Sequence, residues 1–165
     1  MDKRLWIAVV VAVLAGGTYA LFFRRSDEGQ IRRQLAALAA AVRVEDGPGN
    51  PVFRAVHLKD AFAHVFVPRV EMDVPEIGRE PMRREDLVGV TVAAESPFHA
   101  ASLDFTGVRV AIEDPPTFAR GTGTAAGLGV QGDGRMRAEK RDFSMRFEKA
   151  GGEWRIAAVS ATPTR

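Results

Sequence analysis

An uncharged run from Leu5 to Phe23 constrains this chain more than any other feature of its sequence. A helix of this length, at about 1.5 Å per residue, spans the roughly 30 Å of bilayer hydrocarbon. Aromatic and basic residues mark both ends of the run, as in transmembrane helices with fixed ends: Lys3, Arg4 and Trp6 at its start, and Tyr19, Arg24 and Arg25 at its end. The sequence therefore predicts a membrane anchor over residues 1–25, with one transmembrane helix at 5–23, and a single domain over 26–165.

Two other interpretations of the apolar run remain open. A basic start, an apolar stretch and the small residue Ala20 are also what a signal peptidase recognises. The run continues past Ala20 to Phe23 and ends in two arginines, however, which favours a retained anchor. A buried core helix would need a larger domain than the remaining residues provide, about 140 in number.

The charges near the anchor leave its orientation open. Four arginines follow the anchor closely, and a literal count of positive charge would keep the domain in the cytoplasm: Arg24, Arg25, Arg32 and Arg33. A short basic N-terminal tail, in contrast, is typical of an anchor whose tail stays inside while the following domain is exported. We favour export. The chain has no cysteine, which fits either side of a membrane and excludes thiol catalysis, disulfides and cysteine zinc sites.

The charge balance does not suggest a nucleic-acid partner. Lysine and arginine number 23 against 21 acidic residues, a net charge of only +2. Basic residues are interspersed with acidic ones, as in Arg84-Glu85 and Lys140-Arg141-Asp142. We therefore expect a solvated surface of mixed charge.

Hydrophobic periodicity places the helices in the first part of the domain. Ser26 can cap a helix that runs to Glu45 and buries positions spaced by three or four residues: Ile31, Leu35, Leu38 and Val42. The dense turn signal at 46–51 ends this helix. Further helices are predicted at 57–66 and 83–95, with a strand at 70–74 and a loop at 79–82 between them.

The second part of the domain is predicted to be an antiparallel meander of four strands. The strands cover 103–112, 118–130, 136–147 and 154–161. Gly107 interrupts the alternation of the first strand as a β-bulge does. A second slip in phase is predicted between Ala138 and Phe143, because the apolar residues change parity there. An aromatic core is expected beneath the helices: Phe105, Phe143, Phe147 and Trp154.

The order of these elements and several short motifs resemble one known superfamily. The motifs are Ser26-Asp27-Glu28, Arg84-Glu85-Asp86-Leu87 and the closing Gly152-Glu153-Trp154-Arg155-Ile156. The chain resembles the NTF2-like, or SnoaL-like, superfamily, and in particular its bacterial members with one N-terminal membrane helix. The resemblance implies an α+β cone of three helices on a curved, bulged antiparallel sheet, with dimers through the sheet. It also implies a single-pass protein of the bacterial inner membrane, and with export the domain is periplasmic.

The resemblance does not carry over a known catalytic site. Ketosteroid isomerases of this fold use a pocket tyrosine with two aspartates, whereas the only tyrosine here is Tyr19, inside the apolar run. Epoxide hydrolases of the fold also need tyrosine and asparagine, and the only asparagine is Asn50, in a turn. Dehydratases of the fold need tyrosines around the pocket as well, and this chain has none there. We therefore expect no enzymatic activity and no cofactor.

A few polar residues remain as candidates for ligand binding. His57, Asp60 and His64 share one arc of a predicted helix, but about 10 Å of helix axis separates the two histidines. That distance is too long for one metal ion, so we predict no metal site and a solvated helix flank. Arg120 shares a strand face with Phe118, and it would bind an anionic ligand if that face lined the cone; otherwise it is an exposed strand arginine.

Two strand patterns add detail without pointing to chemistry. Asp104 alternates with Leu103 and Phe105, so it is expected on the outer face. Glycines at every second position of the next strand, with one gap, suit a strand face that bends or receives a close neighbour: Gly121, Gly123, Gly127 and Gly129.

Three classes of function follow. The favoured one is a membrane-anchored, non-catalytic domain that binds a partner protein or a small apolar ligand. The second is a subunit of a larger membrane assembly, because secretion and lipid-transport systems also join one anchor to an NTF2-like domain. The third is an enzyme with an unfamiliar pocket.

Overall fold

The computed structural model describes residues 27–47 and 49–164. The predicted transmembrane helix at 5–23, the anchor range 1–25 and the Ser26 cap lie outside these residues. Among the described helices, none is both long enough and apolar enough to cross a bilayer.

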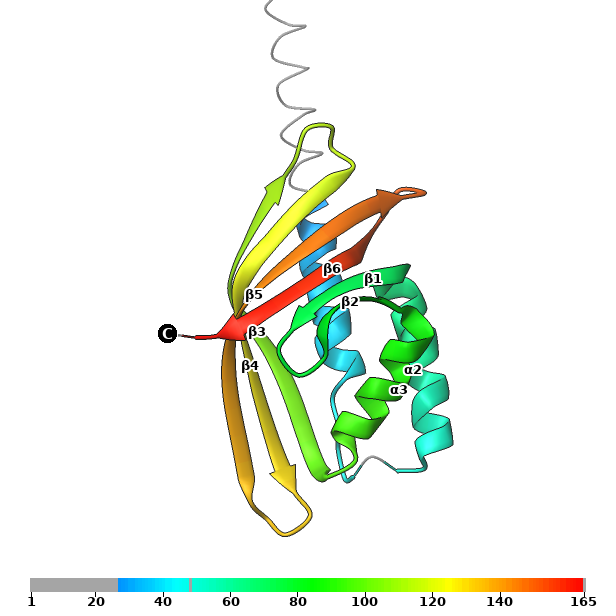
Figure 1. Ribbon diagram of the computed structural model, residues 1–165, viewed down its shortest axis with the longest axis vertical. Helices are drawn as coiled ribbons and strands as arrows, with labels where there is room; N and C mark the ends of the chain where they lie inside the picture. Colours follow the sequence, from blue (N-terminus) through cyan, green and yellow to red (C-terminus); the bar gives the residue numbers. More distant parts are fainter. Residues whose placement is uncertain (1–26, 48, 165) are drawn as a thin grey trace, which may run out of the picture.

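Three helical segments precede or interrupt a six-stranded sheet (Figure 1). The helical segments are residues 27–41, here called the first helix, α2 (Pro51–Val65) and α3 (Arg84–Glu95). The strands are β1 (Phe66–Val74), β2 (Gly78–Arg83), β3 (Phe98–Ile112), β4 (Phe118–Gln131), β5 (Met136–Ala150) and β6 (Glu153–Pro163).

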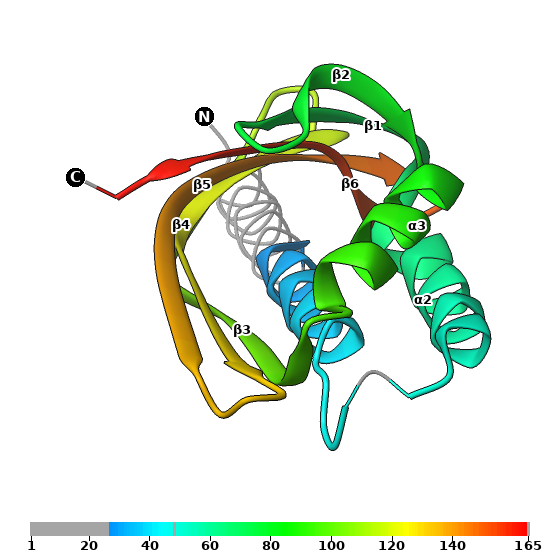
Figure 2. The ribbon, with the colours of Figure 1, turned by 60° about the horizontal axis from the view of Figure 1, so that its bottom comes forward.

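The strands form one sheet in the order β2-β1-β6-β5-β4-β3. Consecutive strands from β3 to β6 pair antiparallel, as the predicted meander requires. The prediction of a wholly antiparallel sheet was wrong, because β1 pairs parallel with β6. Figure 2 shows the sheet bending around the first helix, with α2 and α3 on its open side. The α+β cone expected from the sequence is therefore present.

The first helix buries three of the four side chains that its periodicity predicted, while Val42 lies just past its end and is half-buried. Ile31, Leu35 and Leu38 are at most 7 % exposed, and all three belong to the core. The helix ends at residue 41 and not near Glu45, because Val44 has left it to form a backbone bridge with Ala101 on β3.

The start of α2 was predicted six residues too late. The side chain of Asn50 accepts a hydrogen bond from the Val52 amide at 2.9 Å and caps the helix. Pro51 occupies the first helical position, where its missing N–H leaves no intrahelical bond unmade. The Gly and Pro residues of the turn signal therefore hid a helix start.

The predicted loop at 79–82 was also wrong, because β2 occupies Gly78–Arg83. Pro81 is tolerated there since β2 is an edge strand. β1 in turn begins at Phe66, four residues earlier than predicted. Pro68 precedes the first pair of the β1–β2 ladder, Arg69 with Arg83, so it removes no ladder hydrogen bond there.

Of the two predicted slips in strand phase, one is confirmed. The β3–β4 register shifts between Thr106 and Arg109, and Gly107 has a φ of 61°. The slip predicted in β5 is absent, because β4 and β5 pair without interruption over their common length. The inward residues of β5 keep one parity throughout, and those before Phe143 are charged.

The aromatic core lies where it was predicted, with one exception. Phe147 and Trp154 are fully buried and Phe143 is 4 % exposed. Phe105 is only half-buried, although its ring meets Phe143 edge-on with centroids 5.2 Å apart. Phe105 lies on the edge strand, where the sheet covers it from one side only.

Candidate functional site

A hollow of about 880 Å³ opens on the concave side of the sheet. Strands β3, β4 and β5 form its floor, and the end of α3 and the turn after β1 form its rim. We call this the cone hollow. Apolar side chains supply part of its lining: Val74, Ala94, Phe98 and Ala101.

Glycines on the concave face of β4 make the hollow possible. A Cβ atom on Gly129 would lie 2.5 Å from Cδ1 of Phe98, and one on Gly121 would lie 2.9 Å from the Phe147 ring. Both distances are too short for any other residue without displacing an aromatic ring. The prediction that this glycine series receives close neighbours is confirmed at Gly121, Gly123 and Gly129, whereas a Cβ atom on Gly127 would meet nothing nearer than 4.0 Å. The rings lie directly on the strand and leave the space above Gly127 open.

Three charged side chains of β5 face the same hollow. Arg137, Glu139 and Arg141 share the parity of the buried Phe143, and all three line the hollow. Residues two apart on a strand point to the same face. The inward face of β5 is thus apolar under the helices and charged in the hollow.

Arg141 is held by two carboxylates from different parts of the chain. Its Nη1 donates to Glu76 Oε2 at 2.7 Å, its Nη2 donates to Glu76 Oε1, and its Nε donates to Glu139 Oε1 at 2.6 Å. The Arg141 side chain is 19 % exposed. Glu76 lies on the turn after β1, so this two-point contact ties the rim of the hollow to its floor.

These contacts fix the charge state of the cluster. Hydrogen bonds from Arg141 hold the pKa of the Glu76 carboxyl below its usual range. Hydrogen bonds to Glu76 and then to Glu139 raise the pKa of the Arg141 guanidinium. Arg137 makes no ion pair with any described residue, so it is the cation of the hollow that a ligand can reach without displacing a partner.

The structure brings none of the sequence-predicted ligand residues into the cone hollow. His57, Asp60 and His64 are exposed on α2. Arg120 lies on the convex face with its side chain 63 % exposed and its nearest carboxylate, Glu113, at 4.0 Å. The strand face that Arg120 shares with Phe118 therefore does not line the cone. Over residues 27–47 and 49–164, no three His, Asp or Glu side chains gather closely enough to hold a metal ion.

Sequence reasoning missed Arg137, Glu139 and Arg141 because it placed a slip in phase between Ala138 and Phe143. Had the alternation been continued backward from Phe143, all three would have been assigned to the concave face. Glu76 carries no such signal. It follows β1 in a turn and is 65 residues from its partner in the sequence.

Comparisons with known proteins place this architecture. No family model matches the chain, and no curated protein matches it. Solved structures do. The protein Kfla4162 from Kribbella flavida superposes with a TM-score of 0.71 at 14% identity, over 86% of this chain and 93% of that one. An NTF2-like superfamily protein from Salmonella enterica serovar Typhimurium LT2 gives 0.67 at 14%, over 86% and 94%.

The fold is NTF2-like. An enzyme with the same fold is also similar, the hexachlorocyclohexane dehydrochlorinase LinA-type3 from Novosphingobium barchaimii LL02. Its TM-score is 0.63 at 16% identity, over 86% of this chain and 89% of that one. Identities this low establish a shared NTF2-like fold and transfer no residue roles.

Proposed function

We propose that this chain is a membrane-anchored, non-catalytic NTF2-like protein whose cone hollow binds a small, largely apolar ligand. The observation that carries the proposal is the lining of the hollow, in which apolar side chains from β1, α3 and β3 lie beside the charged groups of Glu76 and β5. Such a lining is typical of small-molecule sites, where apolar area supplies affinity and a few polar groups fix orientation. Arg137 is the polar group best placed for that second role.

The state of the two carboxylates supports a non-catalytic role. A general base must be free to accept a proton at the working pH. Glu76 and Glu139 are both engaged by Arg141, and the lowered pKa of Glu76 makes it a poorer proton acceptor still. None of the three histidines lines the hollow. The described lining therefore offers binding groups and no base free to accept a proton.

Ligand binding is tested with indole as the probe and the full-length ¹⁵N-labelled chain in detergent micelles. Indole is expected to shift the amide resonances of Gly127 and Gly129. In the variant Ala94→Trp, a bulky ring at the rim should weaken this binding about tenfold. The matched control is Ala93→Trp, because Ala93 is the exposed preceding residue of α3 and does not line the hollow. Equal binding by both variants, or no shift with indole, would remove the proposed function.

The anchor is tested separately. We expect the full-length chain to stay in the membrane fraction after carbonate washing, and a chain that begins at Ser26 to lose this association, because only residues 5–23 have bilayer-spanning length. Immunoblots of the washed fractions measure this. Recovery of a mature chain that begins near Leu21 in the supernatant would show instead that the apolar run is a cleaved signal peptide.

A further inference from the structure

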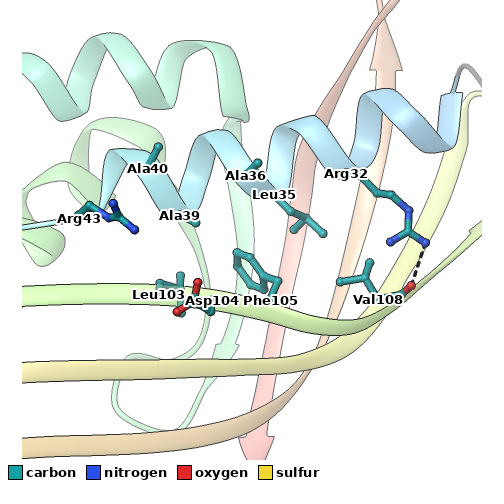
Figure 3. A pocket seen from close by; sticks show the side chains of 10 residues that line it. All are labelled: Arg32, Leu35, Ala36, Ala39, Ala40, Arg43, Leu103, Asp104, Phe105 and Val108. Carbon is teal, nitrogen blue, oxygen red and sulfur yellow. Dashed lines mark hydrogen bonds between the residues drawn. The ribbon is translucent and has the colours of Figure 1, made fainter.

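A second recess, apart from the cone hollow, lies between the first helix and the edge strand β3. It encloses about 500 Å³. Figure 3 shows its two walls, with Leu35, Ala36 and Ala39 on the helix and Leu103 and Phe105 on the strand. We call it the edge groove. The alanines are small, so the helix leaves room along the strand.

Backbone groups of β3 that have no partner at 27–47 or 49–164 face this groove. The Ala101 amide donates to Val44 O at 3.0 Å and its carbonyl accepts from the Val44 amide at 2.9 Å, so both groups of Ala101 point away from β4. Pairing of β3 with β4 is regular from Ala100 to Thr106. Alternate residues of such a strand direct their backbone groups to the same edge. Those of Leu103 and Phe105 therefore point outward too, and no described residue bonds to them.

Both ends of this free stretch are already closed by the chain itself. The Val44 bridge closes one end. At the other, Arg32 Nη2 donates to the Val108 carbonyl at 3.0 Å, a contact drawn in Figure 3. The open stretch between them has room for about five residues at 3.3 Å each. Its length suits a short extended segment.

We infer that the edge groove is a docking site for an extended segment of a partner protein, which adds to β3 as a further strand. Exposed strand edges accept such segments through main-chain hydrogen bonds, and side-chain contacts give selectivity. Side chains of the docked segment that lie on the same face as Leu103 and Phe105 would pack on Leu35 and Ala36. These side chains of the segment are therefore apolar. The residue opposite Asp104 lies on the outer face.

The charge of Asp104 selects the partner's chemistry. Asp104 is exposed, lines the groove and makes no ion pair with any residue at 27–47 or 49–164. A basic residue opposite it completes a cross-strand pair. A second copy of this chain is a poor occupant, because antiparallel pairing of two β3 edges through Leu103 and Phe105 would set the two Asp104 carboxylates directly opposite each other. Like charges in that position destabilise a sheet.

The test uses the full-length ¹⁵N-labelled chain in detergent micelles and the blocked peptide acetyl-Thr-Val-Lys-Val-Thr-amide. At saturation, amide exchange of Leu103 and Phe105 should slow at least about fivefold, the effect of one net hydrogen bond. The amide of Ala101, which is already bonded, should not change. Methylating the backbone nitrogens of both valines removes the donors that face β3 and should abolish binding. Methylating the backbone nitrogen of the lysine, which faces away from β3, should leave binding unchanged.

A charge exchange tests the assigned chemistry. Asp104→Lys should weaken binding of the lysine peptide about threefold, and a peptide with glutamate in place of lysine should regain it. Asp60→Lys on α2 is the matched control, and it should change the binding of neither the lysine peptide nor the glutamate peptide. The inference fails if the peptide methylated at both valines binds as well as the unmethylated peptide. It also fails if Asp104→Lys leaves the preference for the lysine peptide over the glutamate peptide unchanged. It also fails if exchange at Leu103 slows with chain concentration alone, since the occupant would then be a second copy.

Discussion

Replacing Phe147 by alanine is expected to lower the free energy of unfolding by about 3 to 5 kcal/mol, the range for truncating a fully buried phenylalanine. Phe147 is 0 % exposed and lies in the core cluster. Its ring rests on Gly121, so near that a Cβ atom there would come within 2.9 Å of it. A cavity at this point has no flexible neighbour on the strand side that can move in. Urea denaturation followed by circular dichroism measures the loss.

The control for this variant is Phe53→Ala. Phe53 lies on α2 with 74 % of its surface exposed, so its truncation should change the free energy of unfolding by less than about 0.5 kcal/mol. Equal losses in the two variants would contradict the assignment of Phe147 to the core.

The second large effect is expected at Arg54, which joins the three helices. Arg54 Nε and Nη2 donate to the two carboxylate oxygens of Glu95, each at 2.7 Å, and Nη2 also donates to the Ala41 carbonyl at 2.8 Å. The two side chains are only 13 % and 8 % exposed. The variant Arg54→Met leaves the Glu95 carboxylate buried without its cation, which should lower the free energy of unfolding by about 3 to 5 kcal/mol. Thermal and urea denaturation measure it.

Two further variants separate the buried charge from the loss of packing. The double variant Arg54→Met with Glu95→Leu removes both charges and should recover most of the stability. The exposed pair of Arg79 with Asp73 supplies the other comparison, since the Arg79 side chain is 84 % exposed. Arg79→Met should change the free energy of unfolding by less than about 1 kcal/mol. A double variant as unstable as Arg54→Met would mean that shape, and not the unpaired carboxylate, accounts for the loss.

Those parts of the fold with an uninterrupted local pattern could be predicted from the sequence. α3 was expected at 83–95 and lies at Arg84–Glu95. The buried aromatic residues of β5 and β6 were expected for the same reason, and the bulge at Gly107 was expected from the break in alternation there. A periodic run of apolar residues reports directly on which face is buried.

The candidate site could not be predicted in the same way. Its inward residues on β5 are charged, so the apolar alternation stops where the hollow begins, and a slip in phase was inferred in its place. The partnership of Arg141 with Glu76, like that of Arg54 with Glu95, depends on which distant elements meet. That choice is made by the topology, above all by the pairing of β6 with β1, for which no local pattern exists.

The position of β6 has a consequence for how the chain matures during synthesis. Among the strands that the structure describes, β6 comes last in the sequence, yet it lies between β1 and β5 in the sheet. Until it emerges, the β1–β2 hairpin and the β3–β5 meander have no strand to join them, and each presents an open edge to other nascent chains. A chain cut before Trp154 therefore lacks the strand that joins the two half-sheets, and each half-sheet keeps an edge that can pair with another chain.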